Sequence, residues 1–192
     1  MSATPELSEM REVALSSELI FDGQVVHLYR DTVRLPNGAE GTREYIRHIG
    51  AVCVLPLSEN GDVTCVRQFR YPFAEILTEI PAGKLNSKTE NRAEAALREL
   101  REETGLRCAS LTYLGDLYPS PAILDERISL YLAEGLTEGE TDPDDDEFLS
   151  VVRIPLSELT EQVQAGLIPD AKTQIAVMRA ADLLRRRKGA PI

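Results

Sequence analysis

Residues suited to metal chemistry stand close together near the middle of the chain. The segment RELREETGL contains Arg98, Glu99, Glu102 and Glu103 ahead of Gly105. On a helix, positions three and four residues apart share one face, so the three glutamates gather there and repel each other. A hard cation such as Mg²⁺ or Mn²⁺, which prefers oxygen ligands, removes this repulsion, and Arg98 can orient a carboxylate. The alternative is a solvated acidic face, which is common in acidic proteins.

The residues around the glutamates predict the helix itself. Asn91 followed by Glu94 is typical of an N-cap with a capping box, and the alanines and leucines that follow favour helix. Gly105 suits the left-handed position that ends a helix. The sequence therefore predicts a helix that begins after Asn91 and stops at Gly105.

The whole stretch Gly83–Leu106 resembles the Nudix box, G-x5-E-x7-R-E-U-x-E-E-x-G-U, where U is a bulky apolar residue. The matching positions are Gly83, Glu90, Arg98, Glu99, Leu100, Glu102, Glu103, Gly105 and Leu106. The first spacer has six residues instead of five, in a loop where an insertion costs little. Nudix enzymes hydrolyse a diphosphate bond with the help of a divalent metal. The resemblance implies that Glu99, Glu102, Glu103 and the backbone carbonyl of Ala82 bind Mg²⁺ or Mn²⁺.

Three further segments, RQFRYP, PAGKL and YPSPAILDE, are similar to the ADP-ribose pyrophosphatase branch of that family. This implies hydrolysis of ADP-ribose to AMP and ribose 5-phosphate. Ala122 replaces the glycine of the family's ribose-contacting loop, which keeps another nucleotide sugar or a dinucleotide open as the substrate. A non-catalytic nucleotide sensor is the third alternative, although the complete set of glutamates argues against it.

The resemblance also implies residues that contact the substrate. We expect Arg70 to bind a phosphate, whereas Arg67 is interpreted as a surface charge. Ser120 and Glu126, in the loop that resembles the family's ribose-contacting loop, are expected to contact the ribose. Arg43 and Glu44 are expected to reach a partner subunit's active site or else to form a cross-strand surface pair. The predicted substrate-binding set is Arg43, Glu44, Arg70, Lys84, Ser120 and Glu126.

An acidic run between two predicted strands, GETDPDDDEFLSV, supplies candidates for a general base. In similar enzymes a loop carboxylate here activates water, and Glu147 fits best, with Asp145 as the alternative. Glu102 could take the proton instead. The predicted catalytic residues are therefore Glu147, Asp145, Glu102 and, as an orienting group, Arg98.

Composition limits the partners. The 192 residues carry a net charge of −11, which argues against a nucleic-acid backbone or an anionic membrane as the main partner. No signal peptide or membrane span is recognised, and three cysteines without metal or redox spacing fit a reducing cytoplasm. Cys53 and Cys65 lie in strand-like runs and are expected in the core.

Strand-like runs mixed with a few helices predict an α+β fold, an α/β/α sandwich around a mixed sheet as in Nudix proteins. We expect residues 1–47 to form a small antiparallel sheet that makes a homodimer, and residues 48–192 to form the hydrolase domain. Two further helices are predicted over about 157–166 and 172–187, and Asn37-Gly38 is typical of a hairpin turn.

Overall fold

The computed structural model describes residues 7–141 and 148–189, which fall into two compact units. The N-terminal unit comprises Met1–His48 and Ser120–Glu126, and the larger unit comprises Ile49–Pro119 and Arg127–Ile192. Sequence analysis placed Ser120–Glu126 within the hydrolase domain. The structure groups it with the N-terminal strands because Ile46 N donates to the Ile123 carbonyl (2.8 Å) and Asp125 N donates to the Ile46 carbonyl (3.1 Å).

The N-terminal unit is an antiparallel sheet preceded by a short 3₁₀ turn, η1, Leu7–Met10. Its strands, in the order β1-β2-β3, are β1 (Val13–Asp22), β2 (His27–Arg34) and β3 (Glu40–Arg47). The predicted hairpin turn joins β2 to β3, with Gly38 at a φ of 86° and Asn37 Oδ1 accepting from Ala39 N. Every residue of β1 is exposed, including Phe21, Leu19 and Val13. Such an edge strand is open to pairing with another chain.

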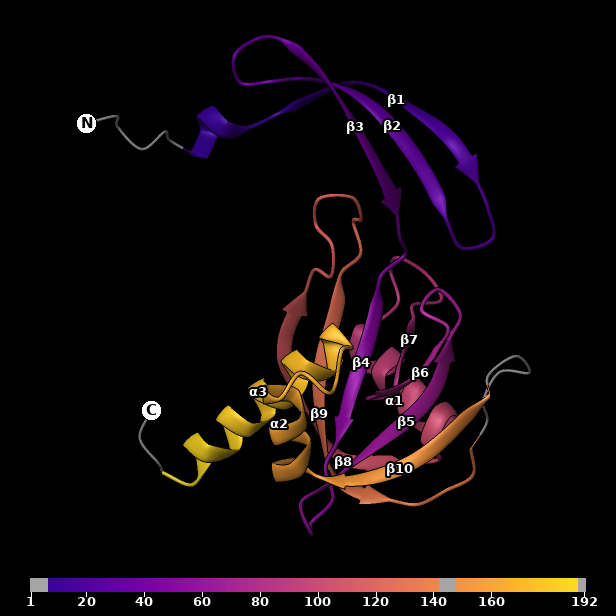
Figure 1. Cartoon of the computed structure of the whole chain (residues 1–192), viewed down its shortest axis with the longest axis vertical. Helices are drawn as coiled ribbons and strands as arrows, with labels where there is room; N and C mark the ends of the chain where they lie inside the picture. Colours follow the sequence, from indigo (N-terminus) through magenta and orange to yellow (C-terminus); the bar gives the residue numbers. More distant parts are fainter. Residues whose placement is uncertain (1–6, 142–147, 190–192) are drawn as a thin grey trace. The chain divides into compact units, whose positions relative to one another are not determined.

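The larger unit contains a four-stranded mixed sheet and a three-stranded antiparallel sheet (Figure 1). The four-stranded sheet has the order β7-β4-β9-β8, with β4 and β9 parallel. The strands of the larger unit are β4 (Ala51–Pro56), β5 (Asp62–Arg70), β6 (Glu75–Glu79), β7 (Ala82–Lys84), β8 (Arg107–Leu117), β9 (Ile128–Thr137) and β10 (Leu149–Pro155). The three-stranded sheet has the order β10-β5-β6.

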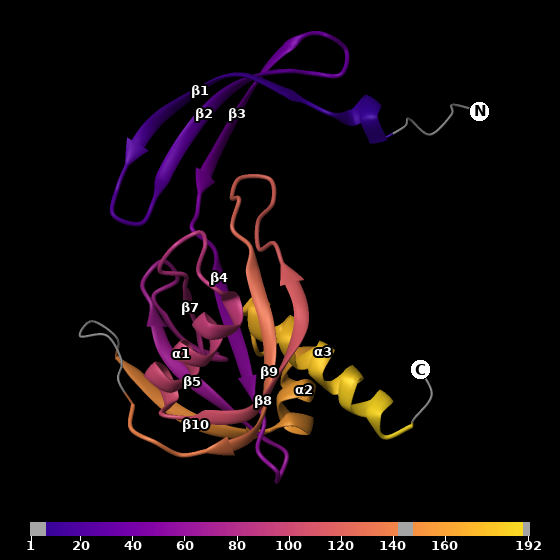
Figure 2. The ribbon, with the colours of Figure 1, turned by 180° about the vertical axis from the view of Figure 1, so that it is seen from behind.

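The helices of the described residues are α1 (Arg92–Thr104), α2 (Leu156–Gln164) and α3 (Ala171–Arg187). Helices α1 and α3 lie on opposite faces of the four-stranded sheet, as the two views in Figures 1 and 2 show, and α2 packs against α3 and β10. Successive side chains of a strand point to opposite faces. Accordingly, Val52 and Val54 pack with α1, whereas Cys53 and Leu55 pack in the core that contains residues of α2 and α3. The predicted α/β/α sandwich is confirmed, and both Cys53 and Cys65 are buried as expected.

The ends of α1 lie where the sequence predicts them. Asn91 has an extended backbone, and its side chain accepts from the amides of Ala93 and Glu94. Gly105 follows the helix in the left-handed conformation, with a φ of 71°, and its amide donates to the Arg101 carbonyl. These two caps fix the register of α1 and therefore the direction in which its glutamates point.

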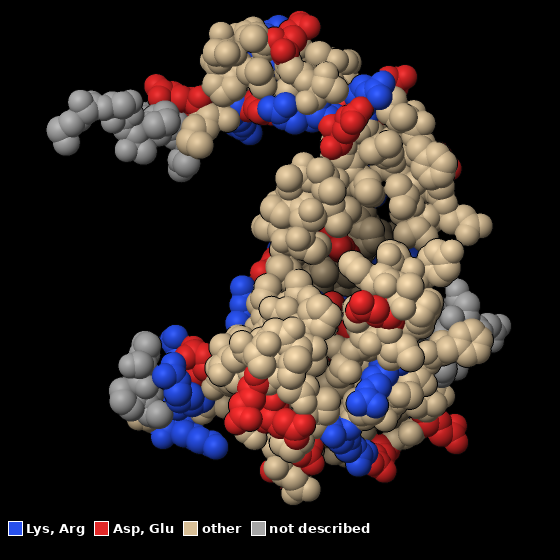
Figure 3. Space-filling model, viewed as in Figure 1, with Lys and Arg blue, Asp and Glu red and all other residues tan. Residues whose placement is uncertain are grey.

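Acidic and basic side chains are interspersed on the face of the larger unit that Figure 3 shows. Within the described ranges, none of the helices combines the length and apolar character needed to span a bilayer.

Candidate active site

The carboxylate of Glu99 lies directly against the backbone of Gly83. A Cβ atom at position 83 would lie 2.2 Å from Cδ and both carboxylate oxygens of Glu99, far inside van der Waals contact. Gly83 belongs to β7 and Glu99 is a buried residue of α1, so this contact joins the strand to the helix. A glycine is therefore required at position 83 for the carboxylate to occupy this place.

Arg98 holds two of the three glutamates together. Its Nη1 donates to Glu99 Oε1 (2.7 Å) and to Glu102 Oε2 (2.9 Å), and its Nη2 donates to the Lys84 carbonyl (3.1 Å). Burial lowers the pKa of Arg98, but the neighbouring glutamates outweigh this effect and raise it, so the guanidinium is charged. The sequence pattern leads us to expect that Arg98 orients one carboxylate, and in the structure its guanidinium donates to two.

Glu90 supports the loop that precedes α1. Its Oε2 accepts from the Asn86 amide, and its Oε1 lies 3.5 Å from Arg98 Nε. The loop between β7 and α1 is thus fastened to the same arginine that orders the glutamates.

Glu103 lies beside the backbone of Ala82, whose carbonyl is another predicted metal ligand. Only 5% of Glu103 is exposed, and its Oε2 accepts from the Ala82 amide at 3.3 Å. The short strand β7 therefore runs along α1, with Ala82 next to Glu103 and Gly83 next to Glu99. The residues that the motif predicts as metal ligands therefore lie on one strand and on the helix next to it.

The donor set suits a hard divalent cation. Three carboxylates and one backbone carbonyl are oxygen ligands of the kind that Mg²⁺ and Mn²⁺ bind, and two of the carboxylates are buried. In residues 7–141 and 148–189, no three histidine, cysteine, aspartate or glutamate side chains converge as metal ligands. The bonds from Arg98 to Glu99 and Glu102 account for this, because they direct those oxygens toward the guanidinium.

Arg70, the predicted phosphate-binding residue, is held by a glutamate at the end of β6. Its Nε and Nη2 donate to the two carboxylate oxygens of Glu79, each at 2.7 Å. Glu79 raises the pKa of Arg70, with smaller contributions from Asp170 and Glu103, so Arg70 and Glu103 are within electrostatic reach of each other. Burial raises the pKa of Glu79, but Arg70 and Lys172 outweigh it, and the carboxylate is ionised.

Four predicted substrate-binding residues belong to the N-terminal unit and have partners there. Arg43 pairs with Glu12, and Glu44 accepts from Arg30 Nε at 3.0 Å. Glu126 Oε1 lies 3.3 Å from His48 Nδ1, and the Ser120 carbonyl accepts from the amides of Ile123 and Leu124. Lys84, in the larger unit, contributes its carbonyl to Arg98. These partners of Arg43, Glu44, Ser120 and Glu126 all belong to the N-terminal unit.

Both loop candidates for the general base, Glu147 and Asp145, lie in 142–147 and so outside the described residues. Glu102, the third candidate, is held by Arg98 and by Arg101, whose Nη2 donates to Glu102 Oε1 at 3.2 Å.

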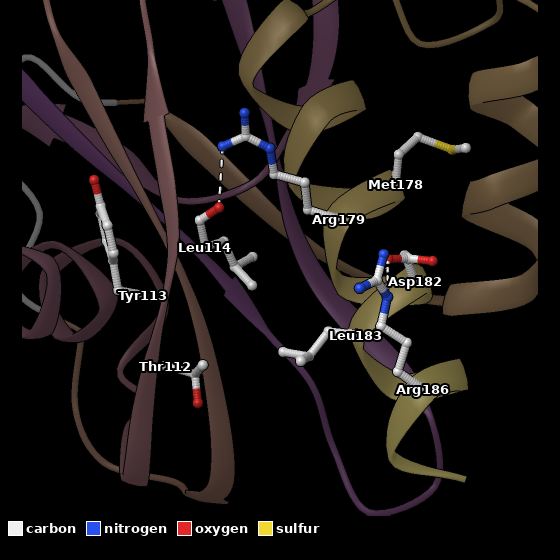
Figure 4. A pocket seen from close by; sticks show the side chains of 8 residues that line it. All are labelled: Thr112, Tyr113, Leu114, Met178, Arg179, Asp182, Leu183 and Arg186. Atoms are coloured by element: carbon white, nitrogen blue, oxygen red, sulfur yellow. Dashed lines mark hydrogen bonds and ion pairs between the residues drawn. The ribbon is translucent and has the colours of Figure 1, made fainter. Parts of the chain in front are cut away.

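An open hollow of about 470 Å³ lies between β8 and α3 (Figure 4). Its two arginines already have partners: Arg186 Nε pairs with Asp182 Oδ2 at 2.7 Å, and Arg179 Nη1 donates to the Leu114 carbonyl at 3.0 Å. None of the residues that line it is a glutamate or belongs to α1 or β7. This hollow is therefore separate from the site that the motif predicts.

Sequence reasoning missed the residues behind Arg70. The sequence patterns assign no role to Glu79, Lys172 or Asp170. One signal was present: Glu79 is a charged residue in the otherwise apolar run ILTEIPA, and a charge in a buried strand requires a partner. The partner could not be identified, because Lys172 is 93 residues away.

Known proteins resemble this chain over most of its length. A family model described as the NUDIX domain matches residues 47–176, and one described as the nucleoside diphosphate sugar hydrolase N-terminal domain matches residues 12–46. An ADP-ribose pyrophosphatase of Bacillus subtilis is 40% identical over 173 residues, which cover 89% of this chain and 93% of that protein. A methanol dehydrogenase activator of Bacillus methanolicus is 42% identical over 168 residues, covering 86% and 90%.

A solved structure titled as an ADP compounds hydrolase has the same fold. The TM-score is 0.84 at 21% sequence identity, and the match covers 97% of this chain and 98% of that one.

Proposed function

Because this chain belongs to the Nudix family, we propose that it hydrolyses the diphosphate bond of ADP-ribose and releases AMP and ribose 5-phosphate. The observation that carries the proposal is the ordered set of carboxylates, with Glu99 against Gly83 and both Glu99 and Glu102 bound to Arg98. The 40% identity to a protein named ADP-ribose pyrophosphatase supports the choice of substrate.

The proposed cofactor is Mg²⁺ or Mn²⁺, held by the Ala82 carbonyl and the carboxylates of Glu99, Glu102 and Glu103. When bound, such a cation withdraws charge from a diphosphate and lowers the pKa of a coordinated water. The predicted ligands are oxygen atoms, and the carboxylates of Glu99 and Glu103 are buried, which favours a hard cation over a softer metal.

The side chains of the chain itself have distinct proposed roles. Arg98 keeps Glu99 and Glu102 in fixed orientations, and Arg70 binds the diphosphate and stabilises the charge of the departing phosphate. Glu147 takes the proton of the attacking water, with Asp145 or Glu102 as the alternative base. Further substrate contacts are proposed for Arg43, Glu44, Lys84, Ser120 and Glu126.

The substrate is tested by comparing ADP-ribose with ADP-glucose and GDP-mannose in saturating Mg²⁺, with products separated by chromatography. We expect kcat/KM for ADP-ribose to exceed that for either nucleotide sugar by about tenfold or more, a discrimination within the range of a few polar contacts. AMP and ribose 5-phosphate should form in equal amounts. Equal or faster turnover of a nucleotide sugar would contradict the choice of ADP-ribose.

The second candidate substrate is another nucleoside diphosphate sugar or a dinucleotide. The description of the model that matches residues 12–46 is equally compatible with ADP-ribose and with other sugars of this class. Ala122 in place of a glycine favours another sugar, since alanine reaches positive φ values less readily. A non-catalytic sensor is disfavoured, because Glu99, Glu102 and Glu103 are all retained. Binding of ADP-ribose without formation of AMP would support the sensor.

We also propose that the N-terminal sheet forms a homodimer. The exposed strand β1, with large apolar side chains such as Phe21 and Val13 more than half exposed, supports this assembly. Sedimentation equilibrium is expected to give twice the chain mass of 21.3 kDa, and a species of 21.3 kDa at micromolar concentration would contradict the dimer. The proposed location is the cytoplasm, which the three free thiols of Cys53, Cys65 and Cys108 support.

A further inference from the structure

Four charged residues from three elements form a partly buried cluster behind the proposed diphosphate site. They are Arg70 at the end of β5, Glu79 at the end of β6, and Asp170 and Lys172 at the start of α3. The exposed fraction is 2% for the Glu79 side chain, 12% for Lys172 and 16% for Asp170. Burying charges costs stability that pairing only partly returns, so a contribution to stability alone does not explain this cluster.

The cluster links α3 to Arg70 through one carboxylate. Glu79 accepts two hydrogen bonds from Arg70, and the ammonium of Lys172 donates to Glu79 Oε2, which also accepts from Arg70 Nη2. Lys172 Nζ also donates to Asp170 Oδ1 at 2.9 Å. Lys172 of α3 therefore holds the side chain of Glu79, which in turn sets the orientation of the Arg70 guanidinium.

The same turn of α3 is fastened to the strand that leads to the glutamates. Asp170 Oδ2 accepts from the amide of Thr173 (2.9 Å) and from its hydroxyl (2.6 Å), and Thr173 Oγ1 accepts from the Ile80 amide (2.9 Å). Ile80 follows Glu79 directly and comes two residues before Ala82. The start of α3 therefore positions both the carboxylate that holds Arg70 and the backbone that leads to the proposed metal ligands.

Charge balance gives Lys172 a second effect. The cluster has two cations and two anions, and removing the ammonium leaves a net negative charge next to Arg70. Burial lowers the pKa of Lys172, but Asp170 and Glu79 outweigh it and raise the pKa, so the ammonium is charged at neutral pH. Both bonds to Glu79 use the Nε–Nη2 edge of Arg70, which leaves Nη1 on the opposite edge to meet a phosphate oxygen.

We propose that Lys172 is a positioning residue for the diphosphate, which acts through Glu79 by fixing the guanidinium of Arg70 and balancing the charge beside it. This rests on the proposed function, in which Arg70 binds the diphosphate. The role differs from a purely structural one, because it predicts that the effect of Lys172 on substrate binding depends on Arg70.

A double-mutant cycle tests the dependence. KM and kcat for ADP-ribose are measured for the wild type, Lys172→Met, Arg70→Ala and the double variant, at a temperature where circular dichroism shows all four to be folded. We expect Lys172→Met to raise KM about tenfold in the wild-type background, as for other residues that orient a ligand-binding group, and less than about twofold in the Arg70→Ala background. The matched control is Lys188→Met, which removes the same charge from an exposed position at the other end of α3 and should leave KM unchanged.

An equal rise in KM in both backgrounds, or no rise in a folded Lys172→Met variant, would overturn the inference. If Lys172→Met does not fold, the variant Lys172→Met with Asp170→Asn replaces it, because it keeps the cluster neutral and asparagine still caps α3. If the wild type turns over no ADP-ribose, the proposed substrate is wrong. In that case the affinity of the same four proteins for inorganic pyrophosphate is measured by calorimetry in the presence of Mg²⁺. If the effects of the two substitutions on this affinity are coupled, the inference is supported, and if they are additive, it is overturned.

Discussion

Replacing Glu103 by glutamine is expected to lower kcat/KM for ADP-ribose at saturating Mg²⁺ by about 100-fold or more, while the protein remains folded. Glu103 is 5% exposed and accepts from the Ala82 amide at 3.3 Å, and an amide oxygen of the same shape can still accept this bond. The substitution therefore keeps the packing and removes the negative charge that a hard cation requires. Loss of one of three neighbouring like charges also relieves repulsion, so the thermal midpoint should not fall.

A matched control separates the metal site from the helix. Glu94→Gln makes the same change of charge on α1, but Glu94 is exposed in the first turn. We expect its activity to stay within about twofold of the wild type and its stability to change by less than about 0.5 kcal/mol, as for most surface substitutions. Steady-state rates over a range of Mg²⁺ concentrations and thermal unfolding give both quantities. A Glu103→Gln variant with a nearly unchanged Mg²⁺-dependent rate would show that this carboxylate is not a metal ligand.

The local features of the site could be predicted because their causes are local. Asn91 and Gly105 begin and end α1 through contacts with residues at most four positions away. The spacing of Glu99, Glu102 and Glu103 on a helix then fixes their common face. The alternation of buried positions in β4, with Val52 and Val54 toward α1 and the intervening residues toward α3, follows from strand geometry in the same way.

The features of the fold and of the site that the sequence does not predict depend on contacts between distant parts of the chain. Nothing near Glu79 identifies Lys172 as its partner, since the hydrogen bond joins residues 93 positions apart. The grouping of Ser120–Glu126 with the N-terminal unit rests on backbone hydrogen bonds to Ile46, which any residue except proline can donate. The sequence pattern also predicts that Arg98 orients a carboxylate, but not that one guanidinium holds both Glu99 and Glu102.

Replacing Gly83 by alanine is expected to reduce kcat/KM about 100-fold through the displacement of Glu99. The φ angle of Gly83 is not positive, so the backbone conformation is open to alanine, and the conflict falls on the carboxylate that would lie 2.2 Å from the new Cβ atom. That carboxylate is the end of a flexible side chain and can move, which limits the loss of stability to about 1 or 2 kcal/mol. Activity should suffer more, because a shift of about 1 Å in a catalytic group can cost 100-fold in rate.

The dependence on Glu99 distinguishes this mechanism from a general disturbance of β7. When Glu99→Gln has already removed the charge, adding Gly83→Ala should reduce the remaining activity by less than about threefold, since both changes affect one interaction. Gly41→Ala is the matched control, because Gly41 is also a strand glycine without a positive φ, and its Cβ would meet the end of the Leu35 side chain at 3.2 Å. If Gly83→Ala were as active as this control, or if its effect were undiminished in the Glu99→Gln background, the close approach of strand and carboxylate would have no part in turnover. Gly83 has no side chain to offer a substrate, and Gly83→Ala leaves its backbone N–H and C=O in place. A loss of activity that vanishes with Glu99 must therefore arise from the space that the missing side chain leaves for the carboxylate.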